Sequence, residues 1–283
     1  MSSSGTTYTR EEQAPPAAGA GRQPVRPRQG RVVLGRVGNA LLPLLVLVVV
    51  LICWQGFVVW HNVPSFVFPR LDKTWASLHT NWPDIWANLQ ITLGEAGLGF
   101  VIGNALAIVG ATIFVYSPLT ERAFFPLAVI VQTIPIIVWS PILVLIFPSG
   151  STWPQVAVAI LISFFPSLVN MTRGLREVDP LELELFHVLN ASRWQVYRKL
   201  RWPSSLPALF ASLRITSTLS LVGAIVGEYV AGGGQGVGYE LLTAKQNIDA
   251  ALVVAITLVV TVTGVVVFLA VAGAERLFLS RRA

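Results

Sequence analysis

The sequence has few charged residues. Asp, Glu, Lys and Arg make up 12% of its 283 residues, while hydrophobic residues make up 54% and the mean hydropathy is +0.67. A soluble domain carries about a quarter of its residues as charges. Between Arg122 and Arg173 there are 50 residues without any charge. This shortage excludes water as the solvent for most of the chain.

Cysteine and histidine are also scarce. The single cysteine, Cys53, allows no internal disulfide and no multi-cysteine metal site. The three histidines, His61, His79 and His187, are scattered along the chain, which argues against a histidine metal cluster. We therefore expect this chain to bind neither a metal ion nor a cofactor.

The sequence lacks the motifs of an ATPase or an intramembrane enzyme. Its glycine-rich stretch "GGGQGVGYELL" (232–242) is not followed by Lys-Ser or Lys-Thr, and no strand precedes it. We expect a tight external turn there, leading into a short surface or re-entrant helix. No histidine lies inside a predicted membrane span, since His61 stands at the very end of the first one, so a Ser/His/Asp or His/Glu catalytic set is improbable. The chain is predicted not to be an enzyme.

The sequence contains several long apolar segments. Ala40–Trp60, Ala96–Thr120 and Ala250–Ala274 each exceed the roughly 20 residues that span a bilayer core. The uncharged stretch after Arg122 is too long for one span, and "PSGSTWPQ" supplies a turn in its middle. A sixth span runs from Ala208 to Val230. We predict an all-α, polytopic membrane protein with six transmembrane helices.

The basic residues predict the orientation of these spans. A net charge of +6 and a pI near 10 are compatible with nucleic-acid binding, but Lys and Arg also mark cytoplasmic loops. With the N-terminus inside, 17 of the 20 Lys and Arg residues lie on the cytoplasmic side. Only Arg70, Lys73 and Lys245 are then external. This asymmetry accounts for the pI and predicts that both termini are cytoplasmic, in a multi-pass protein of the cell membrane.

The chain divides into five predicted parts. They are a disordered cytoplasmic tail (1–36), a first transmembrane helix (37–61), an external segment (62–87), a core (88–277) with a cytoplasmic loop (174–207), and a cytoplasmic tail (278–283). In the external segment, Trp75, Trp82 and Trp86 suit the membrane interface. The stretch after Asp72 is predicted to be a short amphipathic helix.

The predicted spans contain a few polar residues and kinks. Prolines 126, 135, 141 and 166 bend spans where a cavity or neighbouring helices satisfy the freed carbonyls. The polar residues near these bends are Gln132, Thr133, Ser140, Ser163 and Asn170. They either line a solute pathway or form ordinary hydrogen bonds between helices, and the sequence favours neither interpretation. Glu95 lies near the external end of its span, where an interfacial or structural carboxylate is favoured over a transport residue, and Glu228 lies at the outer end of its span.

Small residues recur in the second predicted span. Gly99, Gly103 and Ala107 follow one another every four residues and form a stripe on one helix face. Such a stripe lets another helix approach closely. We interpret it as a packing surface rather than as a site of chemistry.

The charged stretch "DPLELELFHVLNASRWQVYRKLRWPSSLP" (179–207) interrupts the apolar sequence with two helix starts. Asp179 can cap a helix that begins at Pro180 and has Glu182 in its first turn. Asn190 tolerates the left-handed conformation that ends a helix. Ser192 opens a capping box with Gln195. We predict a hairpin of two short helices, with Leu181, Leu185 and Val188 or Leu189 on one face of the first.

This hairpin is suited to docking on a protein. Its surface mixes apolar residues with charges of both signs, whereas a lipid-binding helix is more uniformly basic. A merely solvated loop would need neither two caps nor this many leucines and aromatic residues.

The same stretch resembles the cytoplasmic signature of permease subunits of binding-protein-dependent ABC importers. In that family a Glu-Ala-Ala triplet is followed by Gly and then by Leu-Pro. Glu184 matches the Glu, Leu185 and Phe186 replace the alanines, Asn190 replaces the Gly, and "WPSSLP" matches the ending. Further stretches, such as "QTIPIIVWSPILVLIF" and "VGAIVGEYV…GVGY", resemble the nitrate, sulfonate and taurine branch. Within it, "TIPII" and "SFFPSLVN" resemble permeases for thiamine-precursor pyrimidines or riboflavin.

The resemblance implies where the hairpin binds, which proteins this chain works with, and which residues make the contact. The hairpin would insert into a cytoplasmic ABC ATPase dimer, which supplies ATP hydrolysis, and an extracytoplasmic binding protein would deliver the substrate to a permease homodimer. The residues expected to couple to the ATPase are Asp179, Glu182, Glu184, Asn190, Ser192 and Arg193. The substrate would be a small anion (sulfonate, taurine or nitrate) or a heterocycle. The alternative is an ion-coupled secondary transporter, which the lack of ionisable residues at mid-membrane disfavours.

Overall fold

The computed structural model describes residues 45–46, 48–148 and 150–280, and every regular element in this part of the chain is helical. An apolar helix runs from Val48 to Trp60. The elements that follow are α2 (Leu71–Thr80), α3 (Trp82–Tyr116), α4 (Pro118–Thr133), α5 (Ile136–Ile146), α6 (Trp153–Arg176), α7 (Pro180–Val188), α8 (Arg193–Val196), a π-helical turn η1 (Tyr197–Arg201), α9 (Trp202–Ala231), α10 (Val237–Gln246) and α11 (Ala250–Ser280). The all-α prediction is confirmed for the described residues. The predicted tail 1–36, the start of the first span and residues 281–283 lie outside them.

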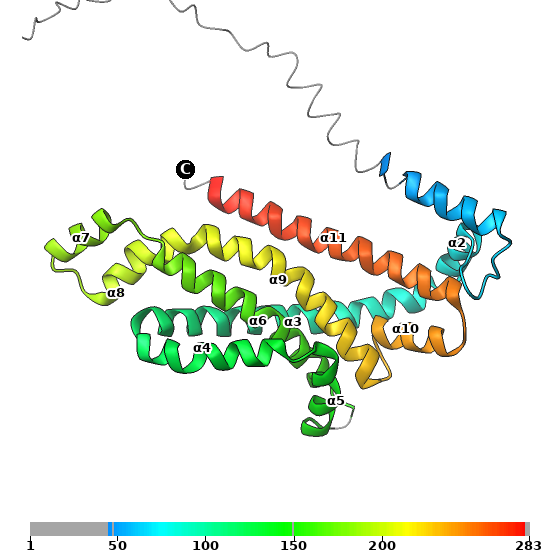
Figure 1. The fold of residues 1–283 in the computed structure, drawn as a ribbon, viewed down its shortest axis with the longest axis horizontal. Helices are drawn as coiled ribbons and strands as arrows, with labels where there is room; N and C mark the ends of the chain where they lie inside the picture. Colours follow the sequence, from blue (N-terminus) through cyan, green and yellow to red (C-terminus); the bar gives the residue numbers. More distant parts are fainter. Residues whose placement is uncertain (1–44, 47, 149, 281–283) are drawn as a thin grey trace, which may run out of the picture. The chain divides into compact units, whose positions relative to one another are not determined.

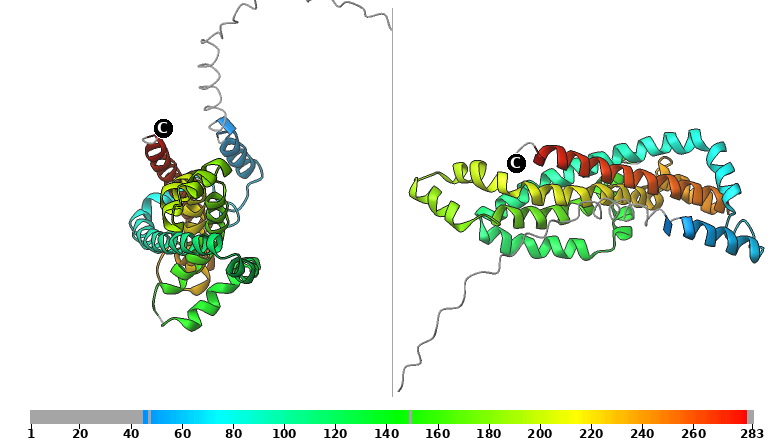
Figure 2. Two further views of the ribbon diagram at one scale, coloured as in Figure 1. Left: turned by 90° about the vertical axis from the view of Figure 1, so that its left-hand side faces the viewer. Right: turned by 90° about the horizontal axis from the view of Figure 1, so that it is seen from above.

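The chain separates into two units, residues 1–54 and residues 55–283. In the second unit, α3, α6 and α9 run side by side and form a three-helix core (Figure 1). Figure 2 shows the same bundle from two further sides. The elements described below all belong to this second unit.

Small residues allow the three core helices to approach closely. A side chain at Gly103 would meet the carbonyl oxygen of Ile160 at 3.0 Å, and one at Gly223 would meet the Cα of Ala159 at 2.8 Å. Ala107 is fully buried in an apolar cluster that includes Leu168 and Met171. The predicted packing role of the Gly99–Gly103–Ala107 stripe is confirmed, because these positions face α6 where any larger side chain would separate the helices.

Four helices are long and apolar enough to cross a membrane: Trp82–Tyr116, Trp153–Arg176, Arg193–Ala231 and Ala250–Phe278. A fifth candidate is the pair α4 and α5, whose axes are bent by 101°. The sequence predicts one kinked span here, but the bend is sharp enough to divide it into two helices. Ile134 is extended because it precedes Pro135, and that proline restricts its backbone away from the helical region.

The first of these helices begins earlier than the sequence suggests. α3 starts at Trp82 with Pro83 in its first turn and passes through residue 87, the expected end of the external segment, without a break. Asp84 in the first turn favours this start, because an acidic side chain interacts well with the free N–H groups there. The preceding helix α2 is the predicted amphipathic helix, in which Thr74 is buried and Trp75 is exposed.

The two ends of the three-helix core differ. At one end, here called the hairpin end, α7 and α8 project from α6 and α9 (Figure 1). At the other end, here called the loop end, α9 stops at Gly232 and α10 follows after the glycine-rich turn. Gly232, Gly234 and Gly236 have φ angles of 64°, 78° and 92°, which favour glycine. The expected tight turn followed by a short helix is confirmed.

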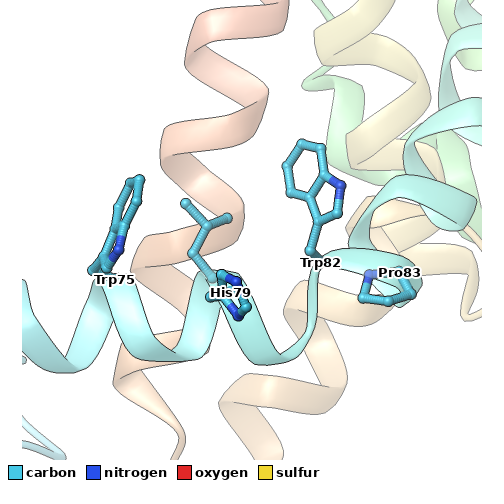
Figure 3. A pocket seen from close by; sticks show the side chains of 5 residues that line it. Trp75, His79, Trp82 and Pro83 are labelled. Atoms are coloured by element: carbon cyan, nitrogen blue, oxygen red, sulfur yellow. The ribbon is translucent and has the colours of Figure 1, made fainter.

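An apolar pocket lies beside α2 and the start of α3. It has a volume of about 370 Å³ and is lined by Trp75, Leu78, His79, Trp82 and Pro83 (Figure 3). The rings of Trp82 and Trp86 stack with their centroids 6.0 Å apart. Both indoles remain substantially exposed. This exposure agrees with the expected interfacial position of the tryptophans, where an indole meets apolar and polar surroundings together.

Candidate functional site

The hairpin is built by local capping interactions, as the sequence predicts. Asp179 Oδ1 accepts a hydrogen bond from the backbone N–H of Leu181 at 2.9 Å. Ser192 and Gln195 form a complete capping box, with Ser192 N–H donating to Gln195 Oε1 at 2.7 Å and Gln195 N–H donating to Ser192 Oγ at 3.3 Å. Between them, Asn190 has a φ of 52°. Both caps and the left-handed turn are confirmed, so each short helix has a defined start.

One face of α7 is apolar and exposed. Leu181, Leu185 and Val188 follow the helical spacing of four and three residues, and their exposed fractions are 72%, 56% and 84%. Leu183 and Phe186, on the opposite face, are partly covered by the rest of the chain. Three large apolar side chains on one exposed face have no packing role within the described structure. They provide a surface that another molecule can cover.

Hydrogen bonds attach the hairpin to the core helices. Tyr116, the last residue of α3, donates its hydroxyl to the carbonyl oxygen of Arg193 at 3.1 Å. The hydroxyl oxygens of Thr112 and Tyr197 lie 3.1 Å apart. Arg201 Nη1 donates to the carbonyl oxygen of Leu175, at the end of α6, at 2.8 Å. The hairpin is therefore fixed to α3 and α6 as well as to α9.

The second helix of the hairpin continues directly into a membrane span. Arg193–Ala231 is a single helical stretch in which η1 joins α8 to α9. At the junction, the N–H of Trp202 donates to the carbonyl of Tyr197, five residues earlier. Pro203 follows this junction, in the first turn of α9. The wider π turn accommodates a proline, which has no N–H to donate, without breaking the helix.

The predicted coupling residues lie close to one another. Asp179, Glu182, Glu184, Asn190, Ser192 and Arg193 are all exposed on this hairpin. Glu184 and Arg193 both line a cavity of about 580 Å³ between the hairpin and the end of α3. None of the four ion pairs among the described residues involves Glu184. Its carboxylate is therefore available for a partner outside this chain.

The predicted pathway residues do not lie in one environment. Gln132 and Thr133 are exposed at the end of α4, and Asn170 is half-buried on α6. Ser140 and Ser163 are fully buried, and their hydroxyls donate to the carbonyls of Gly227 and Ala159 at 3.2 and 2.7 Å. The structure does not bring the five side chains together, and their assignment to a pathway stays a prediction.

A polar contact between three spans was not found from the sequence. Asn104 Oδ1 on α3 accepts hydrogen bonds from Ser167 on α6 and from Thr216 on α9, the latter at 3.1 Å. All three side chains are buried. The position of Asn104 in the middle of an apolar span could have drawn attention to it. Its partners could not be predicted, because they depend on the relative register of three helices.

Two ion pairs were also missed. Arg176 Nη1 and Nη2 donate to Glu121 Oε1 and Oε2 at 2.9 and 2.5 Å, which ties α6 to the start of α4. Arg214 on α9 has its Nε 3.1 Å from Glu275 Oε2 on α11. In each pair the partners are more than fifty residues apart, so local spacing carries no signal for them.

Within the described ranges, no group of three His, Cys, Asp or Glu side chains is arranged to hold a metal ion. The expectation that this chain binds neither metal nor cofactor stays a prediction.

Comparison with known proteins identifies relatives over most of the chain. Residues 99–280 match the family described as binding-protein-dependent transport system inner membrane component. A probable ABC transporter permease from Haemophilus influenzae is 32% identical over 219 residues, which cover 77% of this chain and 89% of that protein. The formylaminopyrimidine transport permease ThiX from Halalkalibacterium halodurans is 30% identical over 86% of this chain and 97% of that protein. The riboflavin transport permease RibX from Chloroflexus aurantiacus is 30% identical over 66% of this chain and 70% of that protein.

The fold also has solved counterparts. A chain of the MetNI methionine ABC transporter, crystallised in an inward-facing conformation, superposes with a TM-score of 0.57 at 18% sequence identity. The match covers 69% of this chain and 94% of that one. At this identity the likeness concerns the fold alone.

Proposed function

The chain belongs to the family of binding-protein-dependent transport system inner membrane components, and on this premise we propose that its hairpin 179–207 couples a solute pathway to a separate ATPase. The resemblance read from the sequence is confirmed by this match. The chain is a multi-pass inner-membrane permease of the ABC importer type. What remains to be assigned is how it is driven, how it is oriented and what it transports.

The observation that carries the coupling proposal is the construction of the hairpin. It presents exposed apolar residues on α7, while its second helix continues through η1 into the span α9. An ATPase that closes on ATP would move the docked hairpin, and a continuous helix would pass that movement into the membrane. Asp179 and Ser192 would keep the two helices rigid, and Glu184 would offer a charge-assisted contact to the ATPase.

Reconstitution tests this proposal directly. The chain and a partner ABC ATPase are incorporated in proteoliposomes, a partner binding protein is added outside, and solute uptake is measured with and without enclosed ATP. We expect uptake that requires ATP and persists when an uncoupler removes the proton gradient. Uptake by this chain alone, without ATP and abolished by the uncoupler, would instead support an ion-coupled secondary transporter.

We further propose that two copies of this chain form the pathway, with a binding protein on the external side. Family membership supports an ATPase and a binding protein as partners. The homodimer rests on the resemblance, in which one permease chain supplies half of a pathway. Mass determination of the purified complex in detergent should give two permease chains for each ATPase dimer.

For the substrate class we propose a heterocycle rather than a small anion. Two relatives are named for transport of formylaminopyrimidine and riboflavin. In the apolar interior of the described spans, the basic residue Arg214 is already paired with Glu275. An anion pathway would be expected to offer an unpaired positive charge. Competition for uptake should therefore be strong with pyrimidines or flavins and weak with sulfonates or nitrate, and the reverse order would contradict this assignment.

A further inference from the structure

Two acidic side chains face each other inside the loop end of the core. Thr92 Oγ1 on α3 accepts a hydrogen bond from the N–H of Val237, and Glu228 on α9 accepts one from the N–H of the next residue, Gly238. Glu95 follows Thr92 by one turn of α3, so the two acidic side chains lie beside each other at the start of α10. Their exposed fractions are 5% and 0%. They lie 133 positions apart in the sequence, and packing of α3 against α9 brings them together.

The surroundings of this carboxyl pair supply no positive charge. The neighbouring part of α6 contributes the buried amide of Gln155, and neither α5 nor residues 250–274 of α11 contains an ionisable residue. α10 contributes Tyr239, Glu240 and Lys245, and the exposed Lys245 donates to the hydroxyl of Tyr229 on α9. None of the ion pairs among the described residues includes Glu95 or Glu228. Two charges of the same sign would therefore be uncompensated.

The backbone of the glycine-rich turn closes over the pair. Glu228 Oε2 accepts a hydrogen bond from the N–H of Gly238 at 2.7 Å. Any side chain at Gly236 would overlap the Glu228 carboxyl group. Glu228 Oε1 and Glu95 Oε2 are buried without a donor from another group. Each acid thus has an oxygen that still needs a hydrogen, and a single proton on one carboxyl group can supply it.

We propose that Glu95 and Glu228 bind one proton between them and that this proton joins α3, α9 and the start of α10 at the loop end. Two buried carboxylates in contact cannot both be ionised without a large energetic cost, whereas a carboxyl and a carboxylate form a strong hydrogen bond. The proton is a structural ligand of the permease. The inference depends on the geometry of the pair and not on the identity of the transported solute.

Infrared spectroscopy of the purified permease tests this directly. A protonated carboxyl group has a C=O stretching band that carboxylates lack, and the band shifts in D₂O. We expect wild-type protein with ¹³C-labelled glutamate to show the isotope-shifted band at neutral pH. We expect both Glu95→Gln and Glu228→Gln to lose it, while Glu177→Gln, which changes an exposed carboxylate, retains it. Absence of the band in folded wild-type protein would overturn the proposal, as would its retention in both pair variants.

The pH dependence of stability gives a second readout, in which a nearby glutamate must be controlled. Burial raises the pKa of Glu240 above its ordinary value of 4.5, the hydrogen bond from Asn88 lowers it, and Asp84 raises it. A raised pKa means that the folded state favours the protonated form. Glu240 therefore also makes stability fall as pH rises above 4.5. The measurement is accordingly made in Glu240→Gln protein.

In Glu240→Gln protein we expect the thermal midpoint to fall as alkaline pH removes the shared proton. Adding Glu95→Gln should flatten this dependence, because an amide donates to Glu228 at every pH. A midpoint raised by Na⁺, Mg²⁺ or Ca²⁺ over choline at equal ionic strength, without the carboxyl band, would identify a metal cation in the pair and overturn the shared proton. An equal fall of the thermal midpoint at alkaline pH, with and without Glu95→Gln, would also contradict the shared proton.

Discussion

At the scale of single residues, the turn of the hairpin depends on Asn190. Its φ of 52° lies in the left-handed region, which β-branched residues strongly disfavour, at a cost of about 1–2 kcal/mol. We expect Asn190→Val to distort the junction of α7 and α8 and to lower uptake per ATP hydrolysed several-fold. Asn190→Gly is the matched control and should couple normally, because glycine adopts this conformation freely. Normal coupling in Asn190→Val proteoliposomes would contradict the assigned role of the turn.

Asn104 makes a different contribution, to stability. Replacing it with alanine removes the acceptor shared by Ser167 and Thr216. Thr216 can still donate to the carbonyl of Ser212, but the Ser167 hydroxyl has no second acceptor in the described part of the chain. A buried hydroxyl without a partner costs about 1–3 kcal/mol. We expect a lower thermal midpoint for Asn104→Ala in detergent.

The control for this substitution is Thr257→Ala, whose exposed hydroxyl bonds only within its own helix. Its midpoint should stay close to that of the wild type. Equal midpoints for the two variants would mean that the contact between the three spans does not stabilise the bundle.

These residues also separate what the sequence predicts from what it does not. The caps at Asp179 and Ser192 and the turn at Asn190 were predictable, because each interaction closes within three residues. The partners of Asn104 and the Glu95–Glu228 pair were not, because they depend on how three long helices align. An apolar pattern fixes which face of a helix is buried but leaves its axial register open.

At the scale of secondary-structure elements, the exposed face of α7 is the proposed docking surface. Leu185 lies in the middle of that face and is 56% exposed. We expect Leu185→Asp to abolish co-purification of the ATPase, because a charge would be buried at the interface, while the thermal midpoint of the permease stays unchanged. Leu119→Asp changes a leucine that is 80% exposed at the start of α4, outside the hairpin, and should retain the ATPase. Equal ATPase recovery with both variants would contradict docking on α7.

Prolines explain why element boundaries were harder to predict than the elements. Pro135 separates α4 from α5, whereas Pro126, Pro141, Pro166 and Pro207 remain inside helices. Pro203 is accommodated directly after a π turn. Proline thus ends, bends or continues a helix according to whether neighbouring groups satisfy the freed carbonyl. Which groups are neighbours depends on the tertiary structure and cannot be predicted from the local sequence.

At the scale of the whole molecule, hydropathy predicts membrane insertion well and assembly poorly. The described spans bury small and polar residues against one another, but many large apolar side chains on α4, α5 and α11 stay exposed. An apolar sequence pattern does not distinguish side chains that contact lipid from side chains that contact a second permease chain. The sequence could therefore predict a multi-pass fold. A pathway that forms between two chains cannot be predicted from the hydropathy pattern of a single chain.

Orientation is the last property of the whole molecule that can be tested. The positive charges favour cytoplasmic termini and a cytoplasmic hairpin, and an external loop end. In a Cys53→Ser background, Gln246→Cys at the loop end should react with a membrane-impermeant maleimide on intact cells. Val188→Cys on the hairpin, Gly5→Cys and Arg281→Cys should react only after the membrane is permeabilised.

The four cysteine positions together distinguish six spans from five. Six spans place both termini on the hairpin side, whereas five place one terminus on each side. Labelling of Gly5→Cys but not of Val188→Cys on intact cells would mean that the first apolar helix does not cross the membrane. Labelling of Val188→Cys on intact cells would reverse the orientation. It would also contradict an ATPase docked on α7, since ATP is available only in the cytoplasm.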